Sequence, residues 1–418
     1  MYRFHIYLLP LLLILFISGC DLFSSAGGTD KTERELPREF SAQEKLVAEA
    51  SNDFSFRLLN LLHEKEGNQP FFVSPLSIST AFAMALNGAD GDTYEQMRDF
   101  FGYSGMTNEE INRAYRDLIE LLTTLDPKVV MNIANSIWVR EDFQVLEDFL
   151  ERNRTYFDAE VSRLDFSKPE APDIINAWIE QKTKGLIEEM INEIDPLVVM
   201  YLINAIYFNG DWTVQFDPDE TEDRRFYRDD DTTIEVPTMT GRHEFRYYLG
   251  DDWTALDMWY GDAGFSFTAL MPAEDAALQE LIPDLTIARF QSITSRLEQD
   301  TINVFMPKFE LDYEIDDFPF DLMEMGLTLP FDSFEADFSR ITDIQQIYIS
   351  DVMHRAVIKL DEEGSEAAAV TVIEFRELSA GGGGKHYLTI RLDRPFLFFI
   401  RENSSNTILF MGAYTGFE

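Results

Sequence analysis

The stretch EEGSEAAAVTVIEF, Glu362 to Phe375, combines an acidic start with small and β-branched residues, and four glycines, Gly381 to Gly384, follow shortly after it. With the two-residue period of a strand, one face carries no charge and consists of Ser365, Ala367, Ala369, Thr371, Ile373 and Phe375. The charges of Glu366, Glu374 and Arg376 all fall on the other face. Because glycines precede and follow it, the segment is either a hinged loop that changes state or an edge strand before a glycine-rich turn.

The composition predicts a large folded core and a strongly acidic surface. The chain has 418 residues, 45% of them hydrophobic, and a formal net charge of −42. Such a charge disfavours nucleic acid, anionic lipid surfaces and heparin-like polyanions as partners. The length exceeds the usual single-core limit of about 250–300 residues and by itself favours two domains. No stretch from Phe40 to Glu418 resembles a linker, however.

The N-terminus has the pattern of an export signal. Residues 1–19 begin with a positive charge at Arg3 and continue as an apolar run that is short for a membrane span. The sequence ISGC resembles the bacterial lipobox, and Cys20 is the only cysteine of the chain. We therefore expect a lipid on Cys20, a flexible tether over residues 20–40, and a protein held at the bacterial cell envelope. An ordinary cleaved signal, and hence secretion, is the alternative.

Helical patterns dominate the first half and strand patterns the second, which predicts the α+β class. Ser74 is a good N-cap before Pro75, and Ile174–Ile191 is a predicted amphipathic helix with Gly185 as its weak point. Leu197–Phe208 is a predicted buried strand interrupted by Asn204, which needs a polar network. Further strands are expected at Met131–Val139, Thr301–Phe309, Ala356–Leu360 and Leu388–Leu392, with a hairpin from Phe396–Ile400 and Thr407–Tyr414.

Sequence patterns for catalysis are absent. The five histidines are scattered, and no HExxH, GxSxG, P-loop or GxGxxG motif occurs. The acidic clusters Asp229–Asp231 and Asp361–Glu363 lack calcium-loop spacing, so we interpret them as exposed charge. We therefore expect neither an enzyme, nor a metal site, nor a cofactor.

Several motifs, in one order along the chain, resemble the serpin family of serine protease inhibitors. EEGSEAAAVT (Glu362–Thr371) is similar to the family's hinge motif, and IRLDRPFLFFI (Ile390–Ile400) to its C-terminal signature. FFVSPLSISTAFAMALNGA, NAIYFNGDW and HRAVIKLDEEG resemble a helix and two strands of the same fold. The resemblance implies one domain over residues 41–418 with three β-sheets, about nine helices and a mobile reactive-centre loop.

The resemblance also assigns roles to residues. It implies a hinge of Gly364, Ser365, Glu366, Ala367, Ala368, Ala369, Val370 and Thr371, and a shutter and breach region of Ser74, Ser77, Asn204, Trp212 and His354. The family spacing puts the scissile bond at Leu378–Ser379, although the neighbouring Arg376–Glu377 bond stays open because the following segment is long and glycine-rich.

The implied function is suicide inhibition, in which the cleaved loop enters the main sheet. Leu378 suits a chymotrypsin-, subtilisin- or elastase-like serine protease, and Arg376 would suit a trypsin-like one. A cysteine protease is a further conceivable partner, and the protein is expected to act as a monomer. The alternative is a non-inhibitory surface binding protein with the same fold.

Overall fold

The computed structural model describes residues 38–418, apart from 231, 274–275, 366–385 and 417–418. Residues 33–418 form one compact unit, so the two-domain expectation from length is wrong. The described residues contain nine α-helices, as expected: α1 (Ala42–Glu66), α2 (Pro75–Leu86), α3 (Gly91–Phe100), α4 (Asn108–Thr124), α5 (Glu147–Phe157), α6 (Ala171–Lys182), α7 (Leu278–Leu281), α8 (Ile287–Thr294) and α9 (Phe318–Glu324). Within this described part, no helix combines the length and apolarity needed to cross a membrane.

Fifteen strands of the described chain pair into two sheets. The six-stranded sheet has the order β10 (Phe309–Glu314), β11 (Arg355–Leu360), β12 (Gly364–Ser365), β4 (Met200–Asp211), β2 (Val129–Arg140) and β3 (Glu160–Leu164). The nine-stranded sheet has the order β1 (Phe71–Val73), β15 (Ile408–Tyr414), β14 (Phe396–Glu402), β8 (Phe265–Pro272), β7 (Trp253–Tyr260), β6 (Thr233–Leu249), β9 (Glu298–Pro307) and β13 (Thr389–Arg391), with β5 (Glu222–Tyr227) also on β6.

The long strand β6 accounts for the difference from the three expected sheets. Its residues 238–247 pair with β9, whereas its last residues, 246–249, pair with β7. One strand of 17 residues therefore belongs to two groups of strands and joins them by continuous hydrogen bonding. The expected second and third sheets are thus one connected sheet in the described residues.

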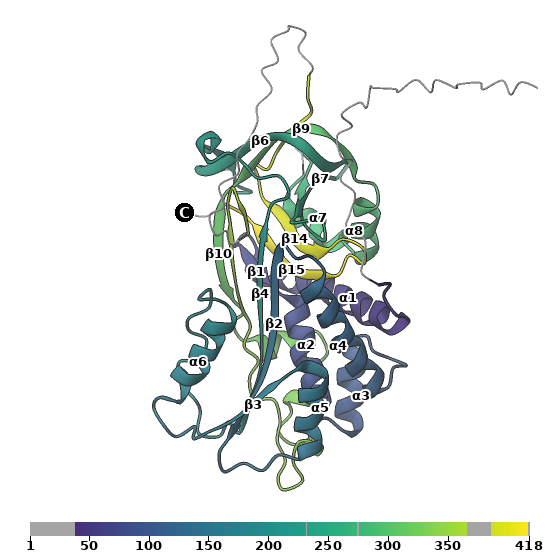
Figure 1. Ribbon diagram of the computed structural model, residues 1–418, viewed down its shortest axis with the longest axis vertical. Coiled ribbons are helices and arrows are strands. Elements are labelled where there is room, and N and C mark those ends of the chain that lie inside the picture. Colours follow the sequence, from purple (N-terminus) through teal and green to yellow (C-terminus); the bar gives the residue numbers. More distant parts are fainter. Residues whose placement is uncertain (1–37, 231, 274–275, 366–385, 417–418) are drawn as a thin grey trace, which may run out of the picture. The chain divides into compact units, whose positions relative to one another are not determined.

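Helices cover both faces of the six-stranded sheet. Figure 1 shows α2 on one face of the β4–β2 pair and α6 on the other. The α2 side belongs to the main hydrophobic core, and the α6 side forms a smaller separate core with Trp138, Ile175 and Ile203. Because both faces of β4 are covered, a polar side chain such as Asn204 has little access to water.

Most predicted elements are present, with two corrections. The predicted helix Ile174–Ile191 ends at Lys182, because Lys184 and Gly185 both adopt positive φ angles of 55° and 89°. The predicted strand Thr301–Phe309 is two strands: β9 ends at Pro307 and β10 begins at Phe309 in the other sheet. A chain that changes sheet at Lys308 keeps an apolar pattern through the change, so the pattern did not reveal the break.

Candidate functional site: the seam between two strands of the six-stranded sheet

Strands β4 and β11 are neighbours that the two-residue strand β12 joins only at one end. Gly364 pairs with Asp211 and Ser365 with Gly210 on β4, while Ser365 also pairs with Leu360 on β11. In the described part of the chain, no backbone pairing links β4 and β11 directly. We call the boundary between these strands, beyond β12, the seam.

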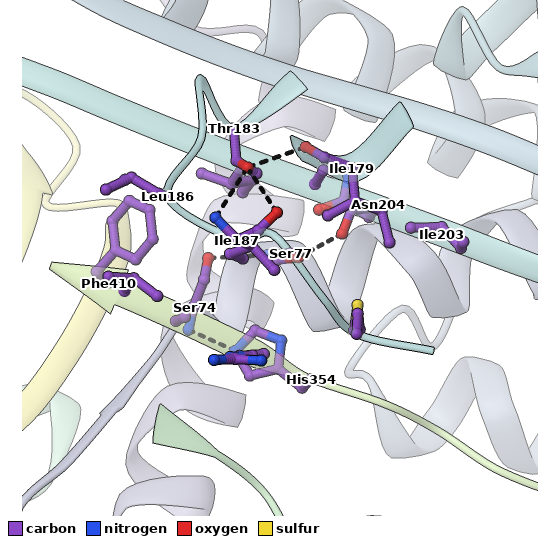
Figure 2. Close-up of a pocket in the computed structure, with 16 residues that line it drawn as sticks. Ser74, Ser77, Ile179, Thr183, Leu186, Ile187, Ile203, Asn204, His354 and Phe410 are labelled. Carbon is purple, nitrogen blue, oxygen red and sulfur yellow. Dashed lines mark hydrogen bonds between the residues drawn. The ribbon is translucent and has the colours of Figure 1, made fainter. Parts of the chain in front are cut away.

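A small cavity of about 20 Å³ lies along the seam (Figure 2). Residues 203–206 of β4 and 355–357 of β11 line it from opposite sides, and Ser74 and Ser77 of the α2 N-terminus line it from the main core. This volume is room for about one water molecule. The seam is therefore a boundary without strand pairing, where the facing edges of β4 and β11 are linked only through β12 in the described residues.

Four side chains predicted from the sequence meet at this cavity. The backbone N–H of Ser74 donates to Nε2 of His354 at 3.0 Å, and the Ser74 hydroxyl donates to the Leu409 carbonyl at 2.7 Å. The Ser77 N–H donates to the Ser74 hydroxyl at 3.2 Å, so Ser74 also caps α2 as expected. The Ser77 hydroxyl lies 3.5 Å from the carbonyl oxygen of Asn204. The structure thus brings Ser74, Ser77, Asn204 and His354 together (Figure 2).

Asn204 uses only one half of its amide group. Its Nδ2 donates to Oδ1 of Asn135 on β2 at 2.7 Å, and Asn135 in turn donates to the Phe157 carbonyl. The Asn204 Oδ1 is buried and has no hydrogen-bond partner among the described residues. A buried acceptor without a donor costs about 1–3 kcal/mol. The native seam therefore contains one buried acceptor, the Oδ1 of Asn204, without a donor among the described residues.

His354 is neutral in this environment. Burial lowers the pKa of the imidazole from 6.5 to about 4. Because Nε2 accepts the Ser74 N–H, the remaining proton is on Nδ1. Protonation of Nε2 would remove this acceptor and place a charge in the core, so the cluster is built for the neutral ring.

Trp212 lies at the end of the seam where β12 joins the two strands. Its ring stacks on Tyr260 with centroids 4.5 Å apart, and the Tyr260 hydroxyl lies 2.5 Å from the Ser365 hydroxyl. The Trp212 N–H donates to the Glu363 carbonyl at 2.7 Å, and its indole N–H donates to the Asp361 carbonyl at 2.9 Å. These contacts hold the chain just before β12 against the end of β4.

Gly364 permits an unusually close approach of β12 to β4. A Cβ atom built on Gly364 would lie 2.1 Å from the Gly210 carbonyl oxygen and 2.8 Å from Cα of Asp211. Both of these neighbours are backbone atoms, which cannot rotate away. Glycine is therefore required for the pairing that starts the seam.

Glu362 is buried, which corrects the interpretation of Asp361–Glu363 as exposed charge. Its carboxylate accepts a hydrogen bond from Thr221 and one from Lys308 Nζ, both at 2.7 Å. Burial alone would raise the pKa of Glu362, but these hydrogen bonds outweigh it and the pKa is lowered. The neighbouring Glu363 is different: burial and the charges of Asp361 and Asp211 raise its pKa.

The remaining predicted site residues lie outside the described part of the chain: Glu366, Ala367, Ala368, Ala369, Val370, Thr371, Leu378, Ser379 and Cys20. Four residues that build the site were not predicted from the sequence, namely Asn135, Tyr260, Lys308 and Thr221. Asn135 had a detectable signal, since it interrupts an apolar strand in the same way as Asn204. The other three lie on strands or loops whose local patterns are ordinary.

Known proteins of similar sequence share nearly the whole chain. Iripin-2 of Ixodes ricinus is 32% identical over 380 residues, which cover 89% of this chain and 94% of that protein. Human neuroserpin is 31% identical over 376 residues, which cover 87% of this chain and 90% of neuroserpin.

Solved structures and a family profile agree with these relatives. A structure of human thyroxine-binding globulin has a TM-score of 0.80 at 28% identity, covering 90% of this chain and 99% of that one. The native state of tengpin, a thermophilic serpin, has a TM-score of 0.78 at 30% identity, covering 93% and 98% of the two chains. The profile of the serpin (serine protease inhibitor) family matches residues 49–416. The chain therefore belongs to the serpin family.

Proposed function

We propose that this protein is a suicide inhibitor of serine proteases of the chymotrypsin, subtilisin or elastase type. Serpins are generally protease inhibitors rather than enzymes. In this proposal the serine hydroxyl of the protease attacks the Leu378 carbonyl and forms an ester, and the amine of Ser379 leaves with the proton. The cut frees the chain that begins at Gly364, and this chain enters the seam before water hydrolyses the ester.

The main observation that supports this proposal is the register of β12. In an antiparallel pair, one step forward on one strand is one step back on its partner. Ser365 pairs with both Gly210 and Leu360, so an extension by six residues places Thr371 opposite Asn204 on β4 and, at the same time, opposite His354 directly before β11. The registers of β4 and β11 relative to β12 are therefore compatible with one continuous strand between them.

The side chains of the entering segment suit the positions that they would take. Alternate residues after Ser365 would point to the same face as Ser365, which is buried against Tyr260. Ala367 would lie between Phe208 and Ile358, and Ala369 between Ile206 and Ala356. Small residues at these positions enter a packed core without overpacking it. This face has no charge as far as Phe375.

Thr371 would supply the hydrogen-bond donor that Asn204 lacks at the seam. Its hydroxyl has one proton to donate and would face the buried Oδ1 of Asn204, which has no partner among the described residues. Insertion would thus satisfy an acceptor that the native state leaves without a donor. With about 0.5–1.5 kcal/mol per new ladder hydrogen bond on two sides, the total gain is on the order of 10 kcal/mol.

The location and partners follow from the sequence. We propose export through residues 1–19, a lipid anchor on Cys20, a tether over residues 20–40, and an inhibitory domain over 41–418 that acts as a monomer at a bacterial cell envelope. Secretion is the alternative if Cys20 is not modified. The negative net charge argues against nucleic acid and heparin-like activators.

Incubation with chymotrypsin, subtilisin, elastase and trypsin tests the proposal. We expect an SDS-stable complex with one of the first three, a released C-terminal peptide that begins at Ser379, and a higher melting temperature of the cleaved protein. A peptide that begins at Glu377 would move the bond to Arg376 and the target to the trypsin type. Cleavage without a complex would favour a non-inhibitory binding protein. Thyroxine-binding globulin, whose structure is similar to this one, is named for such a binding role.

A further inference from the structure

Three arginines stack on two aromatic rings, one on the nine-stranded sheet and one just before its edge strand β13. The guanidinium carbons of Arg224 and Arg391 each lie 4.7 Å from the ring centroid of Phe305, and that of Arg242 lies 5.0 Å from the ring of Tyr387. These distances are typical of cation–π contacts, which hold a planar guanidinium while its edges stay available. We call these five residues the arginine face.

Strand register gathers the arginine face from four strands. Arg242 on β6 pairs with Asn303 on β9, and Asn303 pairs with Thr389 on β13. Two residues further along the same strands, Phe305 on β9 pairs with Arg391 on β13. Hydrogen bonds of 2.8 Å from Arg242 Nε to Asn303 and of 3.1 Å from Asn303 to Thr389 run across these strands. The positions of the cations are therefore fixed by a sheet and not by flexible loops.

Two of the three arginines on this face have no carboxylate partner among the described residues. Arg242 and Arg391 are exposed, and neither forms an ion pair with a carboxylate of the described residues. Arg224 approaches one carboxylate, that of Glu222 at 3.2 Å, but its buried Nε has no partner among the described residues. Glu244 follows Arg242 on the same face of β6 and is exposed. Three arginines against the two glutamates Glu222 and Glu244 still leave a local excess of positive charge on a chain with a net charge of −42.

The face lies where the segment that contains Leu378 rejoins the fold. The described chain resumes at residue 386, and Arg391 is in the first strand after it, β13, at the edge of the nine-stranded sheet. Leu378 is separated from β13 by a piece of chain that spans at most roughly 40 Å. Figure 1 shows β6 and β9 at the opposite end of the fold from α5 and β3. A protease bound at Leu378 would thus be held near this face.

We propose that the arginine face is a second contact surface for the target protease and selects proteases with carboxylates beside the active-site cleft. This inference rests on the proposed inhibitory function and adds the partner's surface chemistry to it. A carboxylate could take hydrogen bonds from Arg391, or from the terminal N–H groups of Arg242, whose Nε already donates to Asn303. Because the loop holds the protease locally, even one such contact raises the rate of complex formation.

A free polyanion is the less favoured occupant of the same surface. The net charge of −42 repels a polyanion at long range, whereas a protease is brought to the face by the loop itself. Polyanion binding is therefore an outcome that the experiment must detect.

The test compares Arg391→Glu and Arg242→Glu with Arg152→Glu. Arg152 is exposed on α5, so its variant has the same change in net charge far from the arginine face. Association rate constants and inhibition stoichiometries are measured against two proteases of the same specificity, one with an acidic and one with a neutral rim around the cleft. For the acidic protease we expect each face variant to lose about tenfold in rate at low salt, with less loss at high salt. The stoichiometry and the Arg152→Glu rates should not change.

Further arms separate the alternatives. Arg391→Lys keeps the charge but not the planar guanidinium, so it should lose less of the rate than Arg391→Glu. Unchanged melting temperatures of both variants exclude damage to the fold as the cause. Equal rates for all three glutamate variants, or equal losses with both proteases at every salt concentration, would overturn the inference while leaving the inhibitory function intact. Loss of binding to a heparin fragment in Arg391→Glu, with protease rates unchanged, would assign the face to polyanions instead. If the wild type traps no protease at all, the proposed function fails and this inference with it.

Discussion

The backbone N–H of Ser74, the N-cap of α2, donates to Nε2 of His354, the residue directly before β11. This bond links the helix beneath the six-stranded sheet to one of the two strands that border the seam. It exists only while the imidazole is neutral, because a protonated Nε2 has no lone pair to accept it. The contact between the N-terminus of α2 and the residue before β11 therefore depends on the protonation state of one buried ring.

The free energy of unfolding should decrease as the pH falls from 6.5 to about 4, the range in which His354 is protonated in the unfolded chain but not in the native state. Burial lowers its pKa from 6.5 to about 4, so the unfolded chain takes up a proton below pH 6.5 that the native state refuses. The stabilisation from the neutral ring is complete above pH 6.5 and is lost progressively down to about pH 4. The total is about 3 kcal/mol. Denaturant unfolding between pH 4 and 8 measures it.

His354→Gln and His386→Gln together isolate this contribution. Glutamine at 354 cannot titrate, so its variant should show a flatter stability profile between pH 4 and 6.5, even if its stability at pH 8 is lower. The exposed His386 provides the control, and its variant should follow the wild-type profile. Parallel profiles for His354→Gln and the wild type would show that other groups cause the pH dependence.

Gly364→Ala should detach β12 from β4. The added Cβ would lie 2.1 Å from a carbonyl oxygen, a clash that only a backbone shift relieves, at a cost of about 1–3 kcal/mol. The expected result is a lower melting temperature of both the intact and the cleaved protein, because both forms use this pairing. Gly185→Ala is the matched control, since Gly185 also has a positive φ but nothing within 4 Å of its Cβ position. A loss no larger than in this control would mean that the close approach of β12 is unimportant.

The buried pair of Asp257 and Arg401 should be costly to break on one side. Arg401 Nη2 lies 2.7 Å from Asp257 Oδ1, and both side chains are at most 2% exposed. Arg401→Met leaves a buried carboxylate that keeps the hydroxyls of Thr268 and Ser266 and the more distant Arg246 as partners, and should destabilise the protein by about 3–5 kcal/mol. Urea unfolding midpoints measure this loss.

Comparison with two other variants identifies the cause of that loss. The double variant Asp257→Leu/Arg401→Met removes both charges and should be less destabilised than Arg401→Met alone. The exposed pair of Arg113 and Glu109 serves as the reference, and Arg113→Ala should cost under about 1 kcal/mol. If the double variant is the least stable of all, lost packing and not the loss of the Arg401 charge beside Asp257 dominates.

The fold was largely predictable because its motifs are local. The N-cap at Ser74, the hairpin of β14 and β15, and the polar interruption at Asn204 each depend on a few adjacent residues. The partners of the site were less predictable, because Lys308 and Tyr260 meet Glu362 and Ser365 only through sheet register. Likewise, Glu362 looks like surface charge in the sequence, and only the tertiary structure shows that it is buried.

Loop insertion itself is tested most directly at Ala369. The register of β12 would place this residue between Ile206 and Ala356, on the face that Ser365 shares with Tyr260. Ala369→Arg would force a charge into that core, so insertion should slow and the ester should be hydrolysed first. Ser365 is a poorer position for the test, because it is already buried in the native structure and an arginine there would also destabilise the uncleaved protein.

We expect Ala369→Arg to be cleaved at the wild-type rate but to form little SDS-stable complex, with the stoichiometry of inhibition rising by about tenfold or more. Glu366→Arg is the matched control, because position 366 would lie opposite the exposed Lys359 and the half-buried Asn209, on the other face. An arginine there stays near solvent and should leave complex formation close to that of the wild type. If Ala369→Arg still traps protease at the wild-type stoichiometry, the segment does not enter the seam in this register, and the inhibitory mechanism proposed for this chain is wrong.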